Sequence, residues 1–220
     1  MKKITLFSIL AALSLTSCNT DSDNDYSALS QESQKNYQAA MSMGAYNDMV
    51  IVFDKKNDAN VNNQTDSVYS SVYVSMNNDS TMRITNFPVA ALAEHITEKD
   101  LSAAIAKEAP RTITCKYFVL PNSTSDVAAL YAWPTDIEMN LAYGADNKSH
   151  KVQLKFLPYQ YPYGMCSLKE PRQMYLPFAF CELWVDGAKT GYLKNSTTSS
   201  SQTNQTVTFV IRNAWKKTGK

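Results

Sequence analysis

The sequence predicts an α+β fold that is mostly β, with antiparallel, sandwich-like sheets and a short helix pair covering one face or end. Three observations lead to this prediction. Apolar and polar residues alternate in many short segments, which is typical of half-buried strands. Turn residues separate these segments at short intervals. One alanine-rich segment, residues 89–109, has apolar residues at helical spacing and lies between two runs of strands.

The first half contains one short helix and a series of strands. The helix is predicted within residues 27–43 and ends at Gly44. A buried strand follows within 46–54, because its centre is dense in β-branched residues. Strict alternation over 67–76 and a returning strand that contains Met82 and Ile84 predict a hairpin with one face in water.

The alanine-rich segment is expected to form two short helices joined near Ile96. Thr97 has the character of an N-cap, because an acid, Asp100, follows three residues later. Pro110 ends the second helix, and residues 111–120 alternate again as a strand that places Cys115 in the core.

The second half is predicted to consist of strands. A hairpin is indicated by strict period two over 137–143 and 150–156, joined by a turn after Gly144. The prolines in 157–164 exclude that segment from a central strand. The remaining strands are expected at 127–133, at 174–185 with an interruption at Pro177, at 190–193 after the Asp186-Gly187 turn, and at 206–214.

The N-terminal residues have the pattern of a secretory signal peptide. Lys2 and Lys3 precede an apolar run over 4–15 that is too short to span a bilayer, and small residues lead to Cys18. The tetrad Leu-Thr-Ser-Cys at 15–18 resembles the lipobox of bacterial lipoproteins. The resemblance implies cleavage before Cys18, a diacylglycerol thioether on its thiol and acylation of the new amine. An ordinary signal peptide that contains a cysteine is the alternative.

The chain is therefore divided into a signal peptide (1–17), an acidic flexible tether (18–26) and a single β-rich domain (27–220). Residues 19–25 of this tether include three acids and no basic or apolar residue, so they cannot bury enough surface to order themselves. Two similar halves within the domain, 44–120 and 127–215, are left open as an internal duplication.

Composition limits the partners and the redox chemistry. The chain has 21 basic and 20 acidic residues, so it offers no basic surface for a nucleic-acid partner. With Cys18 lipidated, Cys115, Cys166 and Cys181 remain, an odd number that allows at most one disulfide. Cys166 and Cys181 are the nearer pair in sequence, but their apolar surroundings also suit free buried thiols.

The whole layout resembles the domain-of-unknown-function lipoproteins of gut Bacteroidetes. The resemblance depends on the lipobox, the entry at 41–46, the break at 84–89 before the helices, Trp133-Pro134 and the turn at 185–187. The acidic, Ser/Asn-rich run after Cys18 is also similar to the signal that sends their lipoproteins to the cell surface. The resemblance implies an outer-membrane, lipid-anchored protein that faces the cell surface, with the periplasmic face as the alternative. It implies no functional residue.

Catalytic signatures are missing from the sequence. There is no nucleophile elbow, no metalloprotease helix, no P-loop and no dinucleotide fingerprint, and the two histidines, His95 and His150, have no second ligand at metal spacing. We therefore expect neither a cofactor nor a metal. Glu138 and Glu182 lie within apolar strand patterns where burial would raise their pKa, so a carboxylate-dependent envelope hydrolase is one alternative.

Aromatic residues are the main candidates for binding. Tyr159, Tyr161 and Tyr163 recur at period two in a proline-bounded segment, with Trp133 and Tyr175 as possible neighbours. Such rings stack on sugars or fill protein interfaces, although they can equally well pack over the edge of the domain. The sequence therefore favours a lipid-anchored, non-catalytic binding module for a glycan or an envelope protein. A structural subunit of an envelope assembly is a further alternative.

Overall fold

Strands of a single antiparallel sheet make up most of the fold. The computed structural model describes residues 29–54, 65–77, 79–158, 163–193 and 207–214. Its elements in chain order are α1 (Gln31–Ser42), β1 (Tyr46–Asp54), β2 (Thr65–Val74), β3 (Thr81–Phe87), η1 (Val89–His95), α2 (Lys99–Ile105), β4 (Arg111–Val119), β5 (Val127–Pro134), β6 (Ile137–Tyr143), β7 (Lys148–Phe156), β8 (Gly164–Ser167), β9 (Met174–Val185), β10 (Ala188–Lys189) and β11 (Val207–Asn213).

The sheet closes on itself as a barrel of eight strands. Around the ring the order is β11, β1, β2, β3, β4, β5, β8 and β9, and β11 pairs with β9 to close it. The predicted mostly-β, antiparallel character is thus confirmed, whereas the two-layer sandwich is replaced by a closed barrel. Alternation shows which face of a strand is buried, but both architectures need the same alternation. The β11–β9 pairing that distinguishes them is long-range.

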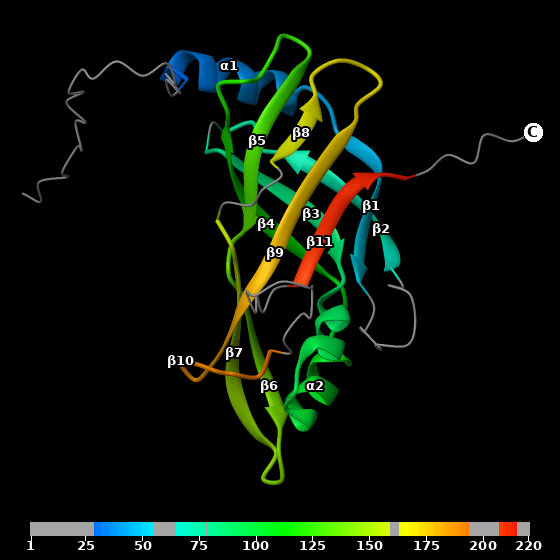
Figure 1. Ribbon diagram of the computed structural model, residues 1–220, viewed down its shortest axis with the longest axis vertical. Helices are drawn as coiled ribbons and strands as arrows, with labels where there is room; N and C mark the ends of the chain where they lie inside the picture. Colours follow the sequence, from blue (N-terminus) through cyan, green and yellow to red (C-terminus); the bar gives the residue numbers. More distant parts are fainter. Residues whose placement is uncertain (1–28, 55–64, 78, 159–162, 194–206, 215–220) are drawn as a thin grey trace, which may run out of the picture.

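A second group of strands extends from the barrel as an arm. The first part of β9 pairs with β11 and β8, and its last residues, from Phe180 to Val185, pair with β7. β6 then pairs with β7, and the short β10 pairs with β9. Figure 1 shows this arm below the barrel, with α2 beside β6 and α1 across the opposite end. One long strand therefore connects the two parts.

A group of phenylalanines fills the barrel. The Phe87 and Phe209 ring centroids are 4.9 Å apart, and the rings of Phe178 and Phe209 stack at 5.9 Å. Phe156 meets Phe87 edge-on at 6.1 Å. Phe87, Phe178 and Phe209 are fully buried. These rings come from β3, β7, β9 and β11, so they join strands that are far apart in the sequence, including the arm strand β7, in one core.

Two short helices form in the predicted segment, but their details differ from the prediction. The first helix, η1, is a 3-10 helix, and α2 begins one residue later than expected and ends at Ile105, before it reaches Pro110. Glu98, and not Thr97, is the N-cap of α2: its carboxylate accepts from the backbone N–H groups of Asp100 and Leu101. The Thr97 hydroxyl instead donates to the Tyr192 carbonyl at 3.0 Å, a long-range contact that local sequence does not reveal.

Three predictions about the strands of the second half were wrong. No strand forms over 190–193: the strand that follows the Asp186-Gly187 turn is β10, Ala188–Lys189, and Leu193 forms an isolated bridge with Ile96. Pro177 does not interrupt β9, because it lies where β9 changes partner: β8 pairs no further than Tyr175, and β7 begins to pair at Phe180. A missing N–H is tolerated where one side of the strand has no ladder partner. The four residues of β8 were not predicted, because they are too few to show alternation.

Candidate functional site

The structure describes some of the predicted site residues and not others. Cys18, Tyr159 and Tyr161 lie outside the described residues. Trp133 is in β5, and Tyr163 directly precedes β8. Both side chains are half-buried, and the Tyr163 hydroxyl accepts a hydrogen bond from Asn122 Nδ2 at 2.7 Å.

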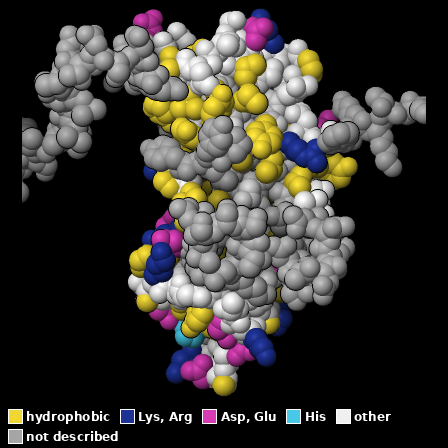
Figure 2. Space-filling view, viewed as in Figure 1, with side chains coloured by type: hydrophobic (Ala, Val, Ile, Leu, Met, Phe, Trp, Pro, Cys, Tyr) yellow, Lys and Arg dark blue, Asp and Glu magenta, His cyan; other side chains and the backbone are white. Residues whose placement is uncertain are grey.

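The outside of the barrel carries an apolar, aromatic surface formed by neighbouring strands. We call it the aromatic outer surface, and it consists of Phe118, Tyr131, Trp133, Tyr163, Met165 and Tyr175. Each of them is followed by a buried residue: Val119, Ala132, Pro134, Gly164, Cys166 and Leu176, respectively. Phe118 is 40% exposed and Met165 46%. In Figure 2 hydrophobic side chains gather over the upper half of this face, where Figure 1 places β5, β8 and β9.

Strand register brings these side chains together. Phe118 of β4 pairs directly with Tyr131 of β5. On the next strands, Met165 of β8 pairs with Tyr175 of β9. Directly opposed residues on one face lie close enough for their side chains to touch. Ala129 of β5 pairs with Met165 of β8, and residues two apart on a strand share a face. The register thus places three of the predicted aromatics, Trp133, Tyr163 and Tyr175, on one outer face.

The two candidate catalytic carboxylates are held in ion pairs on the arm. Glu138 is half-exposed, 3.0 Å from Lys151 Nζ, and also accepts a hydrogen bond from Gln153. Glu182 accepts from Lys189 at 2.6 Å and from the Trp184 indole at 2.8 Å.

These contacts lower the pKa of both carboxyl groups. For Glu138 the main cause is the hydrogen bond from Lys151, and for Glu182 it is the one from Lys189. The hydrolase alternative requires burial that raises these pKa values, whereas Glu138 is exposed, Glu182 is only half-buried, and the pKa of each carboxyl group is lowered. A general acid needs a raised pKa, so this pair is poorly suited to acid catalysis.

The arm carries one further charged pair. His150 Nδ1 lies 2.7 Å from the Asp186 carboxylate, and the ring of Tyr143 lies 4.6 Å from the His150 ring. Within the described ranges, no three His, Cys, Asp or Glu side chains gather as they would around a metal ion.

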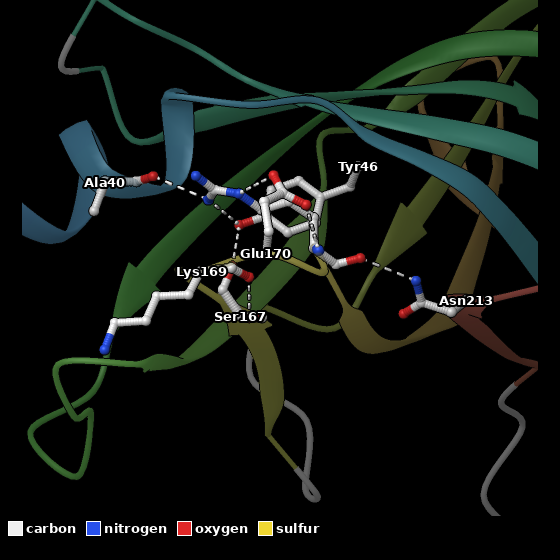
Figure 3. A network of polar contacts seen from close by, with 7 residues as sticks. Ala40, Tyr46, Ser167, Lys169, Glu170 and Asn213 are labelled. Carbon is white, nitrogen blue, oxygen red and sulfur yellow. Dashed lines mark hydrogen bonds and ion pairs between the residues drawn. The ribbon is translucent and has the colours of Figure 1, made fainter.

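A polar network closes the end of the barrel next to α1 (Figure 3). Its centre is Arg172, whose Nη1 donates to the Ala40 carbonyl at 3.1 Å and whose Nε donates to Glu170 at 3.3 Å. The Tyr46 hydroxyl donates to the Ser167 carbonyl at 2.9 Å, and the Asn213 amide donates to the Arg172 carbonyl at 3.1 Å. The network therefore ties α1 to β1, to the β8–β9 loop and to β11.

A pocket of about 640 Å³ opens beside this network, and its lining includes Asn47, Asp48, Glu170 and Arg172. The Arg172 side chain is 12% exposed, and two carboxylates flank the pocket. The Arg172 guanidinium already donates to Glu170 and to the Ala40 carbonyl of α1, so we assign this side chain a structural role.

The thiols lack the environment of reactive cysteines. Cys115, Cys166 and Cys181 are all free, so the possible Cys166–Cys181 disulfide is not formed. Cys115 and Cys166 are completely buried, and burial raises the pKa of each thiol. A thiol in such surroundings is a weak nucleophile.

Sequence reasoning missed several residues of the aromatic outer surface. Phe118, Tyr131 and Met165 were not singled out, although their alternation with buried neighbours was a usable signal for the first two. Nothing in the local sequence connects Met165 to Tyr175, because the short β8 was not predicted.

Together these features define a mostly-β domain: an eight-stranded antiparallel barrel with a β-arm, an aromatic outer face and carboxylates engaged in ion pairs. The chain belongs to the family of the domain of unknown function DUF4840, which matches residues 36–185. The match therefore covers the chain from α1 to the end of β9, without β11. No curated protein and no solved structure matches the chain. Among the described residues, no helix is both long and apolar enough to cross a membrane.

Proposed function

We propose that this protein is a lipid-anchored envelope protein that binds a partner protein through the aromatic outer surface and catalyses no reaction. The observation that carries the proposal is the register that gathers Phe118, Tyr131, Met165 and Tyr175 on one outer face of the barrel. Aromatic residues and Met are enriched in protein interfaces relative to the rest of the surface.

The exposure of this surface favours a protein ligand. Phe118 and Met165 have no polar group, yet each leaves about two-fifths or more of its surface in water. Covering such side chains is favourable, and a partner protein can cover them all together. A glycan is the competing ligand, because tyrosine and tryptophan rings also stack on sugars.

The placement in the envelope is supported by the sequence alone. The basic start, the apolar run and the Leu-Thr-Ser-Cys tetrad argue for acylation at Cys18, and the acidic run argues for an outer-membrane protein that faces the cell surface. A lipid tether would hold the barrel close to partners in the same membrane, which raises their effective concentration.

Photo-crosslinking in the native host tests the binding surface. A benzophenone amino acid at position 118 or 165 should yield one discrete crosslinked protein. The matched control is position 73, because Tyr73 is also 46% exposed but lies on β2. With the benzophenone amino acid at position 131, the double variant Phe118→Ser/Met165→Ser should lose the crosslinked product. The variant Tyr73→Ser should keep it.

Three results would reject the proposal. Equal crosslinking from positions 73 and 165 would show non-specific contact. No protein product, together with glycan-array binding that Phe118→Ser/Met165→Ser abolishes, would replace the protein partner with a glycan. Turnover of an envelope polysaccharide that Glu138→Gln abolishes would restore the hydrolase alternative.

Metabolic labelling tests the anchor separately. The chain should incorporate radiolabelled palmitate, and Cys18→Ala should abolish the label and release the protein from the membrane fraction. Unlabelled wild-type protein with an intact N-terminus would contradict the lipid anchor without affecting the test of the binding surface.

A further inference from the structure

The arm ends in a strand whose outer edge is open. β6 is the last strand of the sheet, and β7 is its only strand partner in the described part of the chain. The Glu138 carbonyl accepts from Arg111 Nη1 at 3.1 Å, so this carbonyl points away from β7. Backbone groups alternate between the two sides of a strand. The N–H and C=O groups of Asn140 and Ala142 therefore face the same open edge.

A groove lies along this edge. It has a volume of about 600 Å³ and is bordered by α2 on one side and by β6 and its turn on the other. Small residues border much of it: Ala103 and Ala104 on α2, and Ala142 and Gly144 on the hairpin. Figure 1 shows α2 running beside β6. The groove thus leaves open space in front of backbone donors and acceptors.

We propose that this groove binds an extended peptide segment of a partner protein, which adds to β6 as a further strand. Asn140 and Ala142 present two donor–acceptor pairs separated by about 6.6 Å, the spacing of alternate residues in another strand. Main-chain hydrogen bonds of this kind give affinity in strand addition.

The two ends of the open edge limit the length of the segment. At one end Arg111 already donates a hydrogen bond to the Glu138 carbonyl. The Nη2 atom of Arg111 donates to Glu108 at 2.5 Å, which holds the guanidinium in place. At the other end the chain turns at Gly144, which has a φ of +80°. The segment therefore pairs over the short stretch between Glu138 and Gly144.

A peptide fits this groove better than a second copy of the chain. A twofold axis that paired β6 with β6 would also bring two α2 helices against the shared edge, because α2 borders the groove in each copy. Side chains of the segment that point towards α2 would meet Ala103, Ala104 and the charged ends of Asp100 and Lys107. These contacts favour small or polar side chains at the positions that face the helix.

Selection from a phage library of random linear dodecapeptides on the full chain tests this site. The selected peptides should bind the wild-type chain, and Asn140→Pro should weaken binding at least tenfold, because proline removes the free N–H. Asn140→Ala, which keeps the backbone, should bind within twofold of wild type. Ala103→Trp fills the groove and should also weaken binding tenfold, whereas Ala106→Trp, on an exposed residue outside the groove lining, should not.

Alternate N-methylation of a selected peptide is the decisive readout. Methylation of one set of alternate amides should abolish binding, and methylation of the other set should leave it within a few fold. Equal loss from both sets, unchanged binding to Asn140→Pro, or no enriched peptide would overturn the proposal. A dimer in sedimentation that Asn140→Pro converts to monomer would overturn it in favour of a second copy. None of these variants alters the aromatic outer surface, so the two sites are tested independently.

Discussion

Two buried tyrosines inside the barrel differ in whether their hydroxyl groups are satisfied. The Tyr46 hydroxyl donates to the Ser167 carbonyl at 2.9 Å, and burial raises the pKa of Tyr46 to about 12. The Tyr117 hydroxyl is buried without a hydrogen-bond partner in the described residues. A buried hydroxyl that has lost its water and gained no partner is destabilising.

We predict opposite effects of the same substitution at these two positions. Tyr117→Phe should raise the free energy of unfolding by about 1 kcal/mol, and Tyr46→Phe should lower it by about 1–2 kcal/mol. Urea unfolding followed by tryptophan fluorescence measures both changes. A lower stability for Tyr117→Phe would mean that its hydroxyl has a partner in the folded protein.

The Asp186 carboxylate gives a prediction about pH. Hydrogen bonds from His150 and from the Lys151 N–H hold the pKa of Asp186 below its usual value. A lowered pKa in the folded state stabilises the fold above the pKa of the unfolded chain, and this contribution is lost as the pH falls through the folded value. Asp186→Asn should therefore reduce the loss of stability below about pH 4. Urea midpoints between pH 3 and pH 7 test this; curves parallel to wild type would contradict it.

At the scale of elements, Gly164 determines how closely β8 and β9 approach. A Cβ at this position would lie 2.6 Å from Leu176 Cδ2 and 2.9 Å from the Tyr175 carbonyl oxygen. The backbone oxygen cannot move without disturbing β9, so only glycine fits here.

Gly164→Ala should therefore destabilise the protein by about 1–3 kcal/mol, as overpacking does elsewhere. Gly191→Ala is the matched control, because a Cβ at Gly191 would meet nothing within 4 Å, and its effect should stay within about 0.5 kcal/mol. Thermal unfolding of the two variants beside wild type decides the question. Equal melting temperatures for both variants would show that β8 can move away from β9.

The elements that the sequence predicted correctly are those with a complete local signal. The β6–β7 hairpin has strict period two on both strands and a turn that contains Gly144, and α2 has a capping acid near its start. The elements that were missed have no such signal. β8 is four residues long, and Pro177 lies in β9 where the partner on one side changes from β8 to β7, a change that the local sequence does not reveal.

The candidate site was predictable in part for the same reason. Trp133 and Tyr163 were identified from residue type, but their shared face depends on the pairing of β5 with β8. The open edge of β6 could not be predicted either, because only the strand order shows that β6 is the last strand of the sheet. Residue chemistry is local, whereas the surfaces that residues form depend on long-range register.

At the scale of the whole molecule, the C-terminal strand β11 completes the barrel. It pairs with β1 on one side and with β9 on the other, and Phe209 and Ile211 are fully buried. Burying two such side chains contributes about 3–6 kcal/mol, which is comparable to the total stability of about 5–15 kcal/mol for a typical protein. The match to DUF4840 ends at residue 185, so it does not include this strand.

We therefore predict that a chain ending at residue 206 does not form the closed barrel. Without β11, β1 and β9 each lose a ladder partner, and the Phe87 and Phe178 rings lose their contact with Phe209. A chain ending at residue 214 retains β11 and is the control. Near-UV circular dichroism and urea unfolding should show fixed aromatic packing and a cooperative transition for the control alone. If the shorter chain unfolded cooperatively at the same midpoint, the residues up to 206 would hold the fold by themselves, and β11 would be an addition to a barrel that is stable without it.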